Sequence, residues 1–579
     1  MSDLVQEYEA DRKALSTHYE LSFTRAYLDR TARFNAEWLS RLEKMDFERL
    51  DPEGRIDHVL LVAKLRKASG ETARQRSRLE EMARLVPAWE WLVDLDRGAW
   101  RGQPPDLRVT SSRLEEWARK VKELKDAVEK GSKDKGSQPP SSKTTGTVKS
   151  DEIAPITVQP VLARRVADTL DQIRHAIERW YGFYDGYRPD FSWWMKKPRD
   201  GCIKALDDYA KLLREEIAGL KGKDEDPLIG EPCGEKELES QIRSQFLPYS
   251  ARELIAIGER ELSWGEQELK ASAKAMGCGD DWHAALEKVK EEFVPPGQQD
   301  ELIAGIAREA TEFVKRHRIV SVPPLCEETW KVSLLSTESM KTIPYAAYGG
   351  QSLLVAYAKE DMAQDDKLMM MRGNNRCFVH LTTPHELIPG HHLQAFVSAR
   401  SRPYRHVFST PFSVEGWALY GELRLWALGW PRNPCERIGM LFWRMNRAAR
   451  IVVSLRFHLG MMKPQEMVEF LIKRVGHEKL GATNEVRRFL GEGYEPLYQA
   501  SYLLGGLQLA ALREEVVSTG KMVEQDFNDR VLQEGPIPIE LIRSSLLGLS
   551  LTRDAAPVWR FMSTGSTPAS IGPPRDPAH

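Results

Sequence analysis

A run of three histidines around a glutamate, between residues 383 and 392, constrains this chain more than any other feature. The segment reads Thr-Pro-His-Glu-Leu-Ile-Pro-Gly-His-His, which places Glu386 directly after His385 and ends on His391 and His392. Imidazoles and carboxylates at such short separations are typical ligands of a catalytic zinc site. The fold therefore has to bring these side chains to one point.

An unbroken helix cannot do this. A regular zinc helix has two histidines four residues apart, with a glutamate after the first, but the residue four after His385 is Pro389. On an ideal helix His391 lies about 120° from the face of His385, and His392 lies about 10 Å along the axis. Proline removes a helical hydrogen bond, and the glycine after it accepts unusual backbone angles. We therefore predict two residues bulged out of the helix, with His385 and His391 as the ligand pair and His392 as the competing ligand.

A second acidic segment, Glu-Gly-Trp-Ala-Leu-Tyr-Gly-Glu, begins 24 residues beyond His391. Glu415 opens it and Glu422 closes it, and a separation of seven residues puts both on one face of a helix. We predict that Glu415 is the third metal ligand. Glu422 can instead orient a histidine, and a solvated helix face is the alternative for both glutamates.

These residues predict a hydrolytic site. Zinc held by two histidines and one glutamate keeps an open position for water and can lower the pKa of that water to about 7. Glu386 follows His385 directly, so we expect it beside the water as general base and not on the metal. The expected cofactor is Zn2+.

The two segments together resemble a family of zincin-like proteins that is catalogued as a domain of unknown function and grouped with the gluzincin metallopeptidases. The resemblance covers roughly residues 150–550. It implies a mainly α-helical gluzincin fold with a small β-sheet beside the active-site helices. It also implies that a tyrosine and a histidine on later helices bind the oxyanion, and Tyr502 and His458 are the candidates carried over. The chain departs from the family pattern at residues 496–500, which read Pro-Leu-Tyr-Gln-Ala where Pro-Gly-Gln is usual.

Most of the remaining chain has the pattern of helical scaffold. We predict that residues 1–129 form an N-terminal helical region. Residues 130–151 are rich in Gly, Ser, Lys and Pro, which predicts a flexible linker or loop. Residues 152–562 would be the catalytic domain and residues 563–579 a disordered tail. An aromatic cluster over residues 180–194 is most simply core, with a pocket lining as the alternative.

A change of composition just before the histidine motif predicts the small sheet. Residues 318–324, 330–335 and 351–357 are β-rich, and the residues before the last of these are turn-like. Peptides often bind by adding a strand to the edge of a sheet. We expect Gln351–Tyr357 to offer such an edge.

Composition argues against several classes of function. Hydrophobic content of 41% and charged content of 29% are those of a soluble globular protein, and a net charge of −2 argues against nucleic acid as a partner. The chain contains no run of 18 apolar residues, so we expect neither a membrane span nor a membrane partner. The six cysteines are scattered and the N-terminus has no secretory pattern. We therefore expect reduced thiols and a cytoplasmic protein.

The most direct interpretation is a zinc metallopeptidase-like hydrolase that cleaves an amide bond in a short peptide or peptide-like metabolite. Two alternatives use the same residues. One is a metal-dependent tailoring enzyme of small-molecule biosynthesis, and the other is a non-catalytic binding protein with a vestigial metal site. The sequence does not separate these interpretations, and it leaves the oligomeric state open.

Overall fold

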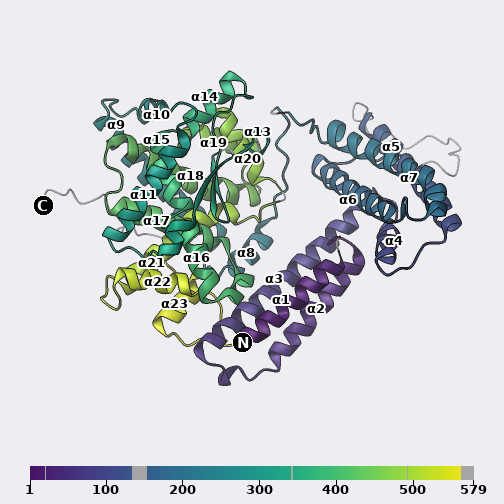
Figure 1. Cartoon of the computed structure of the whole chain (residues 1–579), viewed down its shortest axis with the longest axis horizontal. Coiled ribbons are helices and arrows are strands. Elements are labelled where there is room, and N and C mark those ends of the chain that lie inside the picture. Colours follow the sequence, from purple (N-terminus) through teal and green to yellow (C-terminus); the bar gives the residue numbers. More distant parts are fainter. Residues whose placement is uncertain are drawn as a thin grey trace, which may run out of the picture. The chain divides into compact units, whose positions relative to one another are not determined.

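The structure is a computed structural model that describes residues 1–19, 21–133, 153–223, 225–340, 343, 345–491 and 493–562. It is mainly helical, and the described residues contain one three-stranded sheet (Figure 1). The predicted mainly α fold with a small sheet is therefore confirmed. None of the helices in this part of the chain combines the length and hydropathy that crossing a membrane requires.

The chain divides into two compact units that interleave along the sequence. Unit 1 consists of Met1–Glu9, Lys44–Lys64 and Pro232–His579, and unit 2 of Ala10–Glu43 and Leu65–Glu231. Helices α1 (Ser2–His18) and α3 (Pro52–Met82) contribute residues to both units. The boundaries expected near residues 129 and 152 differ from this division, because the polar stretch between them connects two helices of unit 2.

The two segments predicted to be flexible fall largely outside the described residues. Residues 130–133 form the end of helix α5 (Leu107–Lys133), whereas residues 134–152 lie outside the described part. The predicted tail, residues 563–579, lies outside it altogether.

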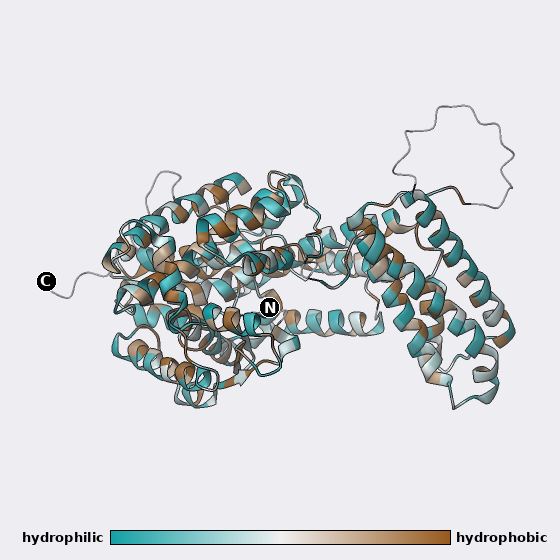
Figure 2. Ribbon diagram, turned by 90° about the horizontal axis from the view of Figure 1, so that it is seen from above, coloured by the Kyte–Doolittle hydropathy of each residue, from teal (hydrophilic) through white to brown (hydrophobic). Residues whose placement is uncertain are grey.

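Unit 2 is built from amphipathic helices around an apolar core. Along α6 the buried residues Val166, Leu170, Ile173 and Ile177 recur at three- and four-residue spacing, as expected for one buried helix face. Figure 2 shows the corresponding alternation of hydrophobic and hydrophilic residues along the helices. Besides α1, α3 and α5, the helices of unit 2 are α2 (Arg25–Glu43), α4 (Glu90–Trp100), α6 (Pro160–Tyr184) and α7 (Pro189–Lys211), the last followed by a π-helical turn (Leu212–Ile217).

Unit 1 contains the histidine motif and a long central helix, α18 (Pro434–His458). Side chains on all sides of α18 are buried, which is typical of a helix at the centre of a core. Ser250 caps helix α9 in a capping box with Glu253. Before the motif lie α8 (Glu235–Ser244), α9 (Ala251–Ala275), α10 (Trp282–Lys290), α11 (Gln299–Arg316) and α12 (Pro324–Thr329), then α13 (Thr337–Met340) between the first two strands of the sheet, and α14 (Gln364–Gly373) after the sheet. From the motif onward follow α15 (Arg376–Glu386), α16 (His391–Ser401), α17 (Pro411–Ala427), α18, α19 (Pro464–Val475), α20 (Lys479–Phe489), α21 (Tyr498–Val516), α22 (Glu524–Gln533) and α23 (Ile539–Leu547).

Helices α17 and α21 touch backbone to backbone. A Cβ atom on Gly416 would lie 2.7 Å from the Cα of Gly505, and one on Gly505 would collide with the carbonyl oxygen of Phe412. Only glycine permits this approach at both positions. The contact holds α21 against α17, and at the start of α21 the hydroxyl of Tyr498 reaches Glu415 of α17.

The sheet contains β1 (Lys331–Leu334), β2 (Ala346–Gly349) and β3 (Ser352–Val355) in the order β1-β3-β2. Strand β3 pairs in parallel with β1 and antiparallel with β2, so that Tyr348 lies opposite Leu353. Two expectations are wrong. Residues 318–324 form no strand, because helix α12 begins there at Pro324. The segment 351–357 offers no free edge, because β3 is the central strand, and the edges belong to β1 and β2.

Candidate metal centre

The two predicted ligand histidines lie on two different helices. Helix α15 ends with His385 and Glu386, and helix α16 begins with His391. The intervening residues 387–390 include a cis peptide bond between Ile388 and Pro389. Leu387 has φ −107° and ψ −100°, outside the helical region, so one helix cannot continue through the motif. A full break therefore replaces the predicted bulge.

The break is held tightly by its neighbours. The indole Nε1 of Trp417 donates a hydrogen bond to the carbonyl of Pro389 (2.7 Å), and the backbone amide of Gly390 donates to the carbonyl of Pro384 (3.0 Å). A Cβ atom on Gly390 would collide with the carbonyl group of His385. Glycine is therefore the residue that lets the chain turn back close enough to bring the second histidine to the first.

The break brings the predicted ligands together. The ring centroids of His385 and His391 are 4.9 Å apart. Atom Oε2 of Glu415 lies 3.2 Å from Nε2 of His391 and 3.9 Å from Nε2 of His385. Ligand atoms around a tetrahedral zinc lie about 3.3 Å apart, given bonds of about 2.0–2.1 Å. The three side chains, each less than 10% exposed, therefore fit one small cation.

A second carboxylate lies close to the histidine pair. Atoms of His385, Glu386 and His391 all lie within 4.8 Å of one another, and Oε2 of Glu386 is 3.9 Å from Nε2 of His391. Either glutamate could therefore complete a set of three ligands. Glu415 fits better, because a single oxygen of its carboxylate faces both imidazoles. Glu386 is then left beside the pair, where a base would be needed.

Glu422 orients the first histidine. Its Oε1 lies 2.7 Å from Nδ1 of His385 and 2.9 Å from Nη2 of Arg447 on α18. Burial raises the pKa of Glu422, but the Arg447 guanidinium and the hydrogen bond with His385 lower it overall. An ionised Glu422 fixes the tautomer of His385 and leaves Nε2 facing Glu415, which is the orienting role that the sequence left open.

The charges in the centre favour an ionised Glu415. Burial raises the pKa of Glu415, but His391, His385 and the hydroxyl of Tyr498, which donates to Oε1 (2.6 Å), hold it well below its usual range. Burial lowers the pKa of His391, but the Glu415 carboxylate outweighs this and raises it to about 8. A carboxylate that stays ionised while buried is the form that binds a metal.

His392 is turned away from this group. Its Nε2 lies 2.8 Å from the backbone carbonyl of Cys326, and its Nδ1 lies 3.3 Å from the hydroxyl of Tyr348 on β2. A carbonyl can only accept, so Nε2 carries the proton and Nδ1 accepts from the tyrosine. Both nitrogens are occupied, which favours His391 over His392 as the ligand.

The two residues carried over for oxyanion binding lie in different places. The ring of Tyr502 is 6.4 Å from the ring of His385, and burial raises the pKa of Tyr502 to about 12. His458 bonds elsewhere: its Nδ1 accepts from the backbone amide of Cys233 (3.4 Å). It also lies about 16 Å along α18 from Arg447, the residue of that helix that reaches the centre. The structure brings Tyr502 to the histidines but not His458.

Sequence reasoning did not identify Tyr498, Arg447 or Tyr348 as parts of the centre. Tyr498 carries a signal, because it lies four residues before Tyr502 and therefore on the same helix face. Arg447 and Tyr348 carry none, since their contacts cross between elements that are far apart in the sequence.

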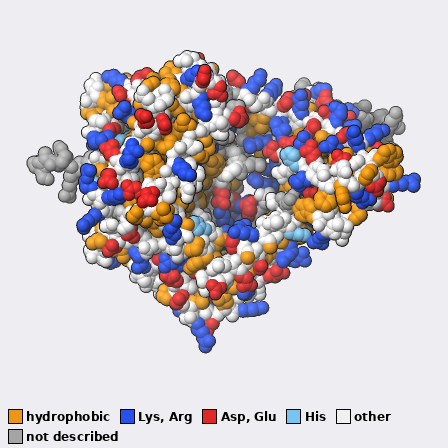
Figure 3. Space-filling view, viewed as in Figure 1, with side chains coloured by type: hydrophobic (Ala, Val, Ile, Leu, Met, Phe, Trp, Pro, Cys, Tyr) orange, Lys and Arg blue, Asp and Glu red, His pale blue; other side chains and the backbone are white. Residues whose placement is uncertain are grey.

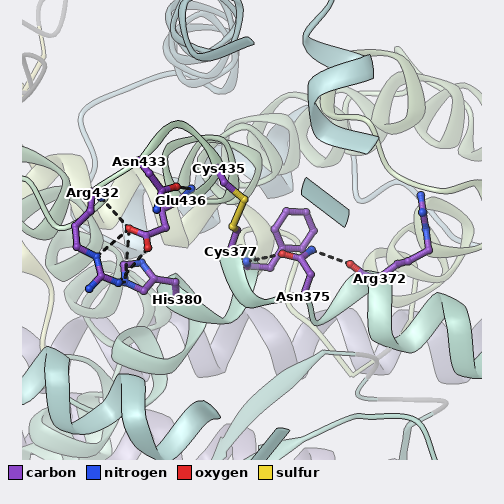
Figure 4. The surroundings of a disulfide bond; sticks show 9 residues. Arg372, Asn375, Cys377, His380, Arg432, Asn433, Cys435 and Glu436 are labelled. Carbon is purple, nitrogen blue, oxygen red and sulfur yellow. Dashed lines mark hydrogen bonds and ion pairs between the residues drawn. A yellow bond between two sulfur atoms is a disulfide. The ribbon is translucent and has the colours of Figure 1, made fainter. Parts of the chain in front are cut away.

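A disulfide joins the beginning of α15 to the beginning of α18. It links Cys377 to Cys435, whose Cα atoms are 6.2 Å apart (Figure 4). Nearby, the side chain of Asn375 caps α15 by accepting from the backbone amide of Phe378 (3.0 Å). The expectation of six reduced thiols is wrong for this pair, because a sequence separation of 58 residues conceals its proximity. The other four cysteines, Cys202, Cys233, Cys278 and Cys326, form no disulfide.

Comparison with known proteins finds similarity over nearly the whole chain. Residues 16–546 match the model of a family described as "Bacterial protein of unknown function (DUF885)". No curated protein matches the chain. A solved protein of unknown function from Shewanella oneidensis, described as a "putative lipoprotein", is 16% identical with a TM-score of 0.67, over 94% of this chain and 99% of that one. A second, from Colwellia psychrerythraea and described in the same way, is 15% identical with a TM-score of 0.59, over 94% and 98% of the two chains.

These similarities establish the fold but no activity. They also overturn one expectation. Both similar structures are described as lipoproteins, which contradicts a cytoplasmic location. The prediction rested on the spacing of the cysteines and on the composition of the first residues, and neither feature identifies a compartment.

Proposed function

The chain belongs to DUF885, a family of bacterial proteins of unknown function, and we therefore propose its function from its own site. We propose a zinc-dependent hydrolase that cleaves amide bonds of short peptides or peptide-like metabolites. One observation carries the proposal. The Nε2 atoms of two histidines on separate helices face the same oxygen of Glu415, at 3.9 and 3.2 Å.

The residues fit a metal for reasons beyond proximity. His385, His391 and Glu415 would hold it, and each is already oriented by a neighbour or by the helix break. The buried Glu415 carboxylate raises the pKa of His391, so this site already attracts positive charge. A zinc ion bound here would activate water at neutral pH and polarise a carbonyl group.

Other side chains would then act as the general base and as hydrogen-bond donors to the oxyanion. Glu386 would take the proton of the attacking water and later deliver it to the leaving amine. Tyr502 and Tyr498, whose ring centroids are 5.8 Å apart on one face of α21, are the candidates for donating to the developing oxyanion. The hydroxyl of Tyr498 already donates to Glu415, so Tyr502 is the better candidate for donating to the oxyanion.

The surroundings support a small, extended substrate. The candidate ligands and Glu386 are each at most 9% exposed, which would exclude most segments of a folded protein. The edge strand β2 lies against the centre, because Tyr348 contacts His392 and its ring lies 6.2 Å from the ring of His391. A peptide that added as a further strand along β2 would pass the histidine pair.

We also infer that the protein works outside the cytoplasm. The Cys377–Cys435 disulfide supports an oxidising compartment. The two similar proteins described as lipoproteins point the same way. The relation to gluzincin metallopeptidases, which the motif suggests, belongs to the same proposal and depends on the activity.

The test combines metal content with turnover. The protein is loaded with Zn2+, its metal content is measured, and it is assayed on a library of dipeptides, tripeptides and acyl-amino acids. Glu386→Gln should retain the metal while turnover falls by about 10²–10⁴-fold. Glu540→Gln, which changes another buried glutamate of unit 1, should affect neither and is the matched control. A metal-loaded enzyme that hydrolyses nothing, or a Glu386→Gln variant as active as the wild type, would refute the proposal.

A further inference from the structure

One end of unit 2 has a surface that the proposed hydrolase does not use. We infer that this end docks on an anionic lipid surface. The inference concerns an interaction surface and does not depend on the metal centre. It departs from the expectation that a membrane is not a partner, because a surface can bind a bilayer without any helix crossing it.

The first observation is the exposure of large aromatic side chains. Trp193 is 76% exposed and Tyr187 80% exposed, and these residues lie at the beginning of α7 and in the turn before it. The aromatic end, as we call the group, consists of Trp100 (44%), Phe183 (51%), Tyr187, Trp193 and Trp194 (36%). It contains the three most exposed tryptophans of the described chain. The aromatic cluster that the sequence suggested as core is therefore divided: Trp180, Tyr181, Tyr184 and Phe191 are buried, whereas Phe183, Tyr187, Trp193 and Trp194 are exposed.

The second observation is that these side chains share one end of the bundle. Four of them lie within residues 183–194, where α6 ends and α7 begins. Helix α4 runs alongside α6 in the same direction, because Met82, before α4, meets Thr169 (3.5 Å) and Asp96, within it, pairs with Arg179 (3.0 Å). Trp100, the last residue of α4, therefore lies level with the end of α6.

The aromatic end is presented rigidly. Below its exposed rings, the buried rings of Trp180, Tyr184 and Phe191 pack against one another, with centroids 5.1 Å apart for Trp180 and Phe191 and 4.8 Å for Tyr184 and Phe191. The exposed rings of Trp193 and Trp194 meet edge to face, 5.1 Å apart at 87°. Side chains held in this way lose little conformational entropy on docking.

The third observation is unbalanced positive charge. Arg101, Lys196 and Lys197 are exposed at this end and have no ion pair with any described residue. Of the acids beside them, Asp190 pairs with Arg188 (2.8 Å), whereas Asp185 accepts a hydrogen bond from Ser192 (2.6 Å) and keeps its charge, so the three cations remain in excess. Figure 3 shows that acidic and basic side chains elsewhere on the visible face are largely intermixed. Exposed aromatic side chains and unpaired cations therefore lie at the same end of unit 2.

The combination favours a lipid headgroup layer over other occupants. Tryptophan and tyrosine prefer the bilayer interface, where the ring is apolar and its polar atom stays hydrated. Each Lys or Arg near an anionic membrane adds to the attraction. A second copy docked on the same end by a twofold axis would bring the free cations against one another. Three cations are few for a nucleic acid, and edge-to-face tryptophans form no flat platform for stacked bases.

The experiment uses the full-length protein and large unilamellar vesicles. Co-sedimentation is measured with phosphatidylglycerol/phosphatidylcholine vesicles and with phosphatidylcholine vesicles, at low and high salt. We expect binding to the anionic vesicles that weakens at high salt. The double variants Trp193→Ser/Trp194→Ser and Lys196→Glu/Lys197→Glu should each weaken it by about tenfold or more.

The matched control removes exposed apolar side chains elsewhere. Met461→Ser/Leu549→Ser changes residues of unit 1 that are 52% and 40% exposed, and it should bind vesicles like the wild type. Circular dichroism of every variant verifies its helical content. Failure of the wild type to bind anionic vesicles, or equal binding by the aromatic variant, would overturn the inference. So would a wild-type dimer in sedimentation velocity that the aromatic variant dissociates without any change in vesicle binding, because the end would then be an interface between copies.

Discussion

Arg447 reaches the candidate metal centre through two intermediate side chains. Its guanidinium pairs with Oε1 of Glu422, and the same oxygen meets Nδ1 of His385, which leaves Nε2 of that ring facing Glu415. A buried carboxylate needs a compensating cation to remain ionised. The orientation of a ligand on α15 is therefore decided by a residue on α18.

This arrangement predicts the effect of removing the charge. Arg447→Met should weaken zinc binding by about 10–100-fold, the usual cost of losing a group that supports a metal ligand. Chelator competition measures the dissociation constant. Arg444→Met is the control, because Arg444 is also buried on α18 but pairs with Glu261 (2.7 Å). Equal losses in the two variants would mean that packing of α18, and not the link through Glu422, sets the affinity.

The residues of the centre were predictable where chemistry is local. The residue types and spacing in two short segments were enough to identify His385, Glu386, His391 and Glu415. His458 was misplaced because a resemblance carries a residue type to a position without testing the distance to the centre. Arg447 was missed because no short-range pattern distinguishes a buried arginine that pairs across helices from one on a solvated face.

At the scale of elements, the helices were easier to predict than their interruptions. Periodic apolar residues and caps such as Ser250 mark helices directly. The break at residues 387–390 was located correctly at its proline and glycine, but its form depends on contacts such as that of Trp417 with the Pro389 carbonyl. The strand order β1-β3-β2 could not be predicted for a similar reason, because strand pairing depends on contacts between segments and not on the sequence within each segment.

The disulfide between α15 and α18 gives a prediction at this scale. Without reduction, denatured protein should take up alkylating reagent at four cysteines, and after reduction at all six. Cys377→Ser should lower the free energy of unfolding by about 2–4 kcal/mol, because it removes a cross-link that closes a long loop. Mass spectrometry counts the alkyl groups, and urea unfolding measures the stability. Cys278→Ser, which removes a free thiol, should change stability little, and six alkylated cysteines before reduction would show that the bond is absent.

The whole molecule should lose stability in mild acid because it buries neutral histidines. Burial lowers the pKa of His477, whose Nε2 lies 3.0 Å from Oδ1 of Asn446, to about 4, and burial lowers the pKa of His458 likewise to about 4. An unfolded histidine titrates near 6.5, so between these values the unfolded chain binds more protons. The contribution is complete above about pH 6.5 and is lost as the pH falls toward about 4.

Urea unfolding at several values between about pH 7 and pH 5 tests this. Each such histidine should contribute a slope of up to about 1.4 kcal/mol per pH unit. His477→Gln should be less stable at neutral pH but should show a shallower decline on acidification. A slope unchanged by the substitution would place the acid sensitivity elsewhere.

The interleaving of the two units decides how the protein can be dissected. Residues 44–64 lie far before the motif in sequence, yet Asp57 among them accepts from Nε of Arg405 (2.8 Å), whose side chain is completely buried and also pairs with Glu534 (2.6 Å). A fragment that began at residue 152 would lack Asp57 and leave this guanidinium paired with Glu534 alone. Breaking a buried ion pair in this way costs about 3–5 kcal/mol. No single cut in the backbone frees the candidate metal centre from the early helices, so any minimal version of the protein has to keep the stretch around Asp57 and splice it to the rest.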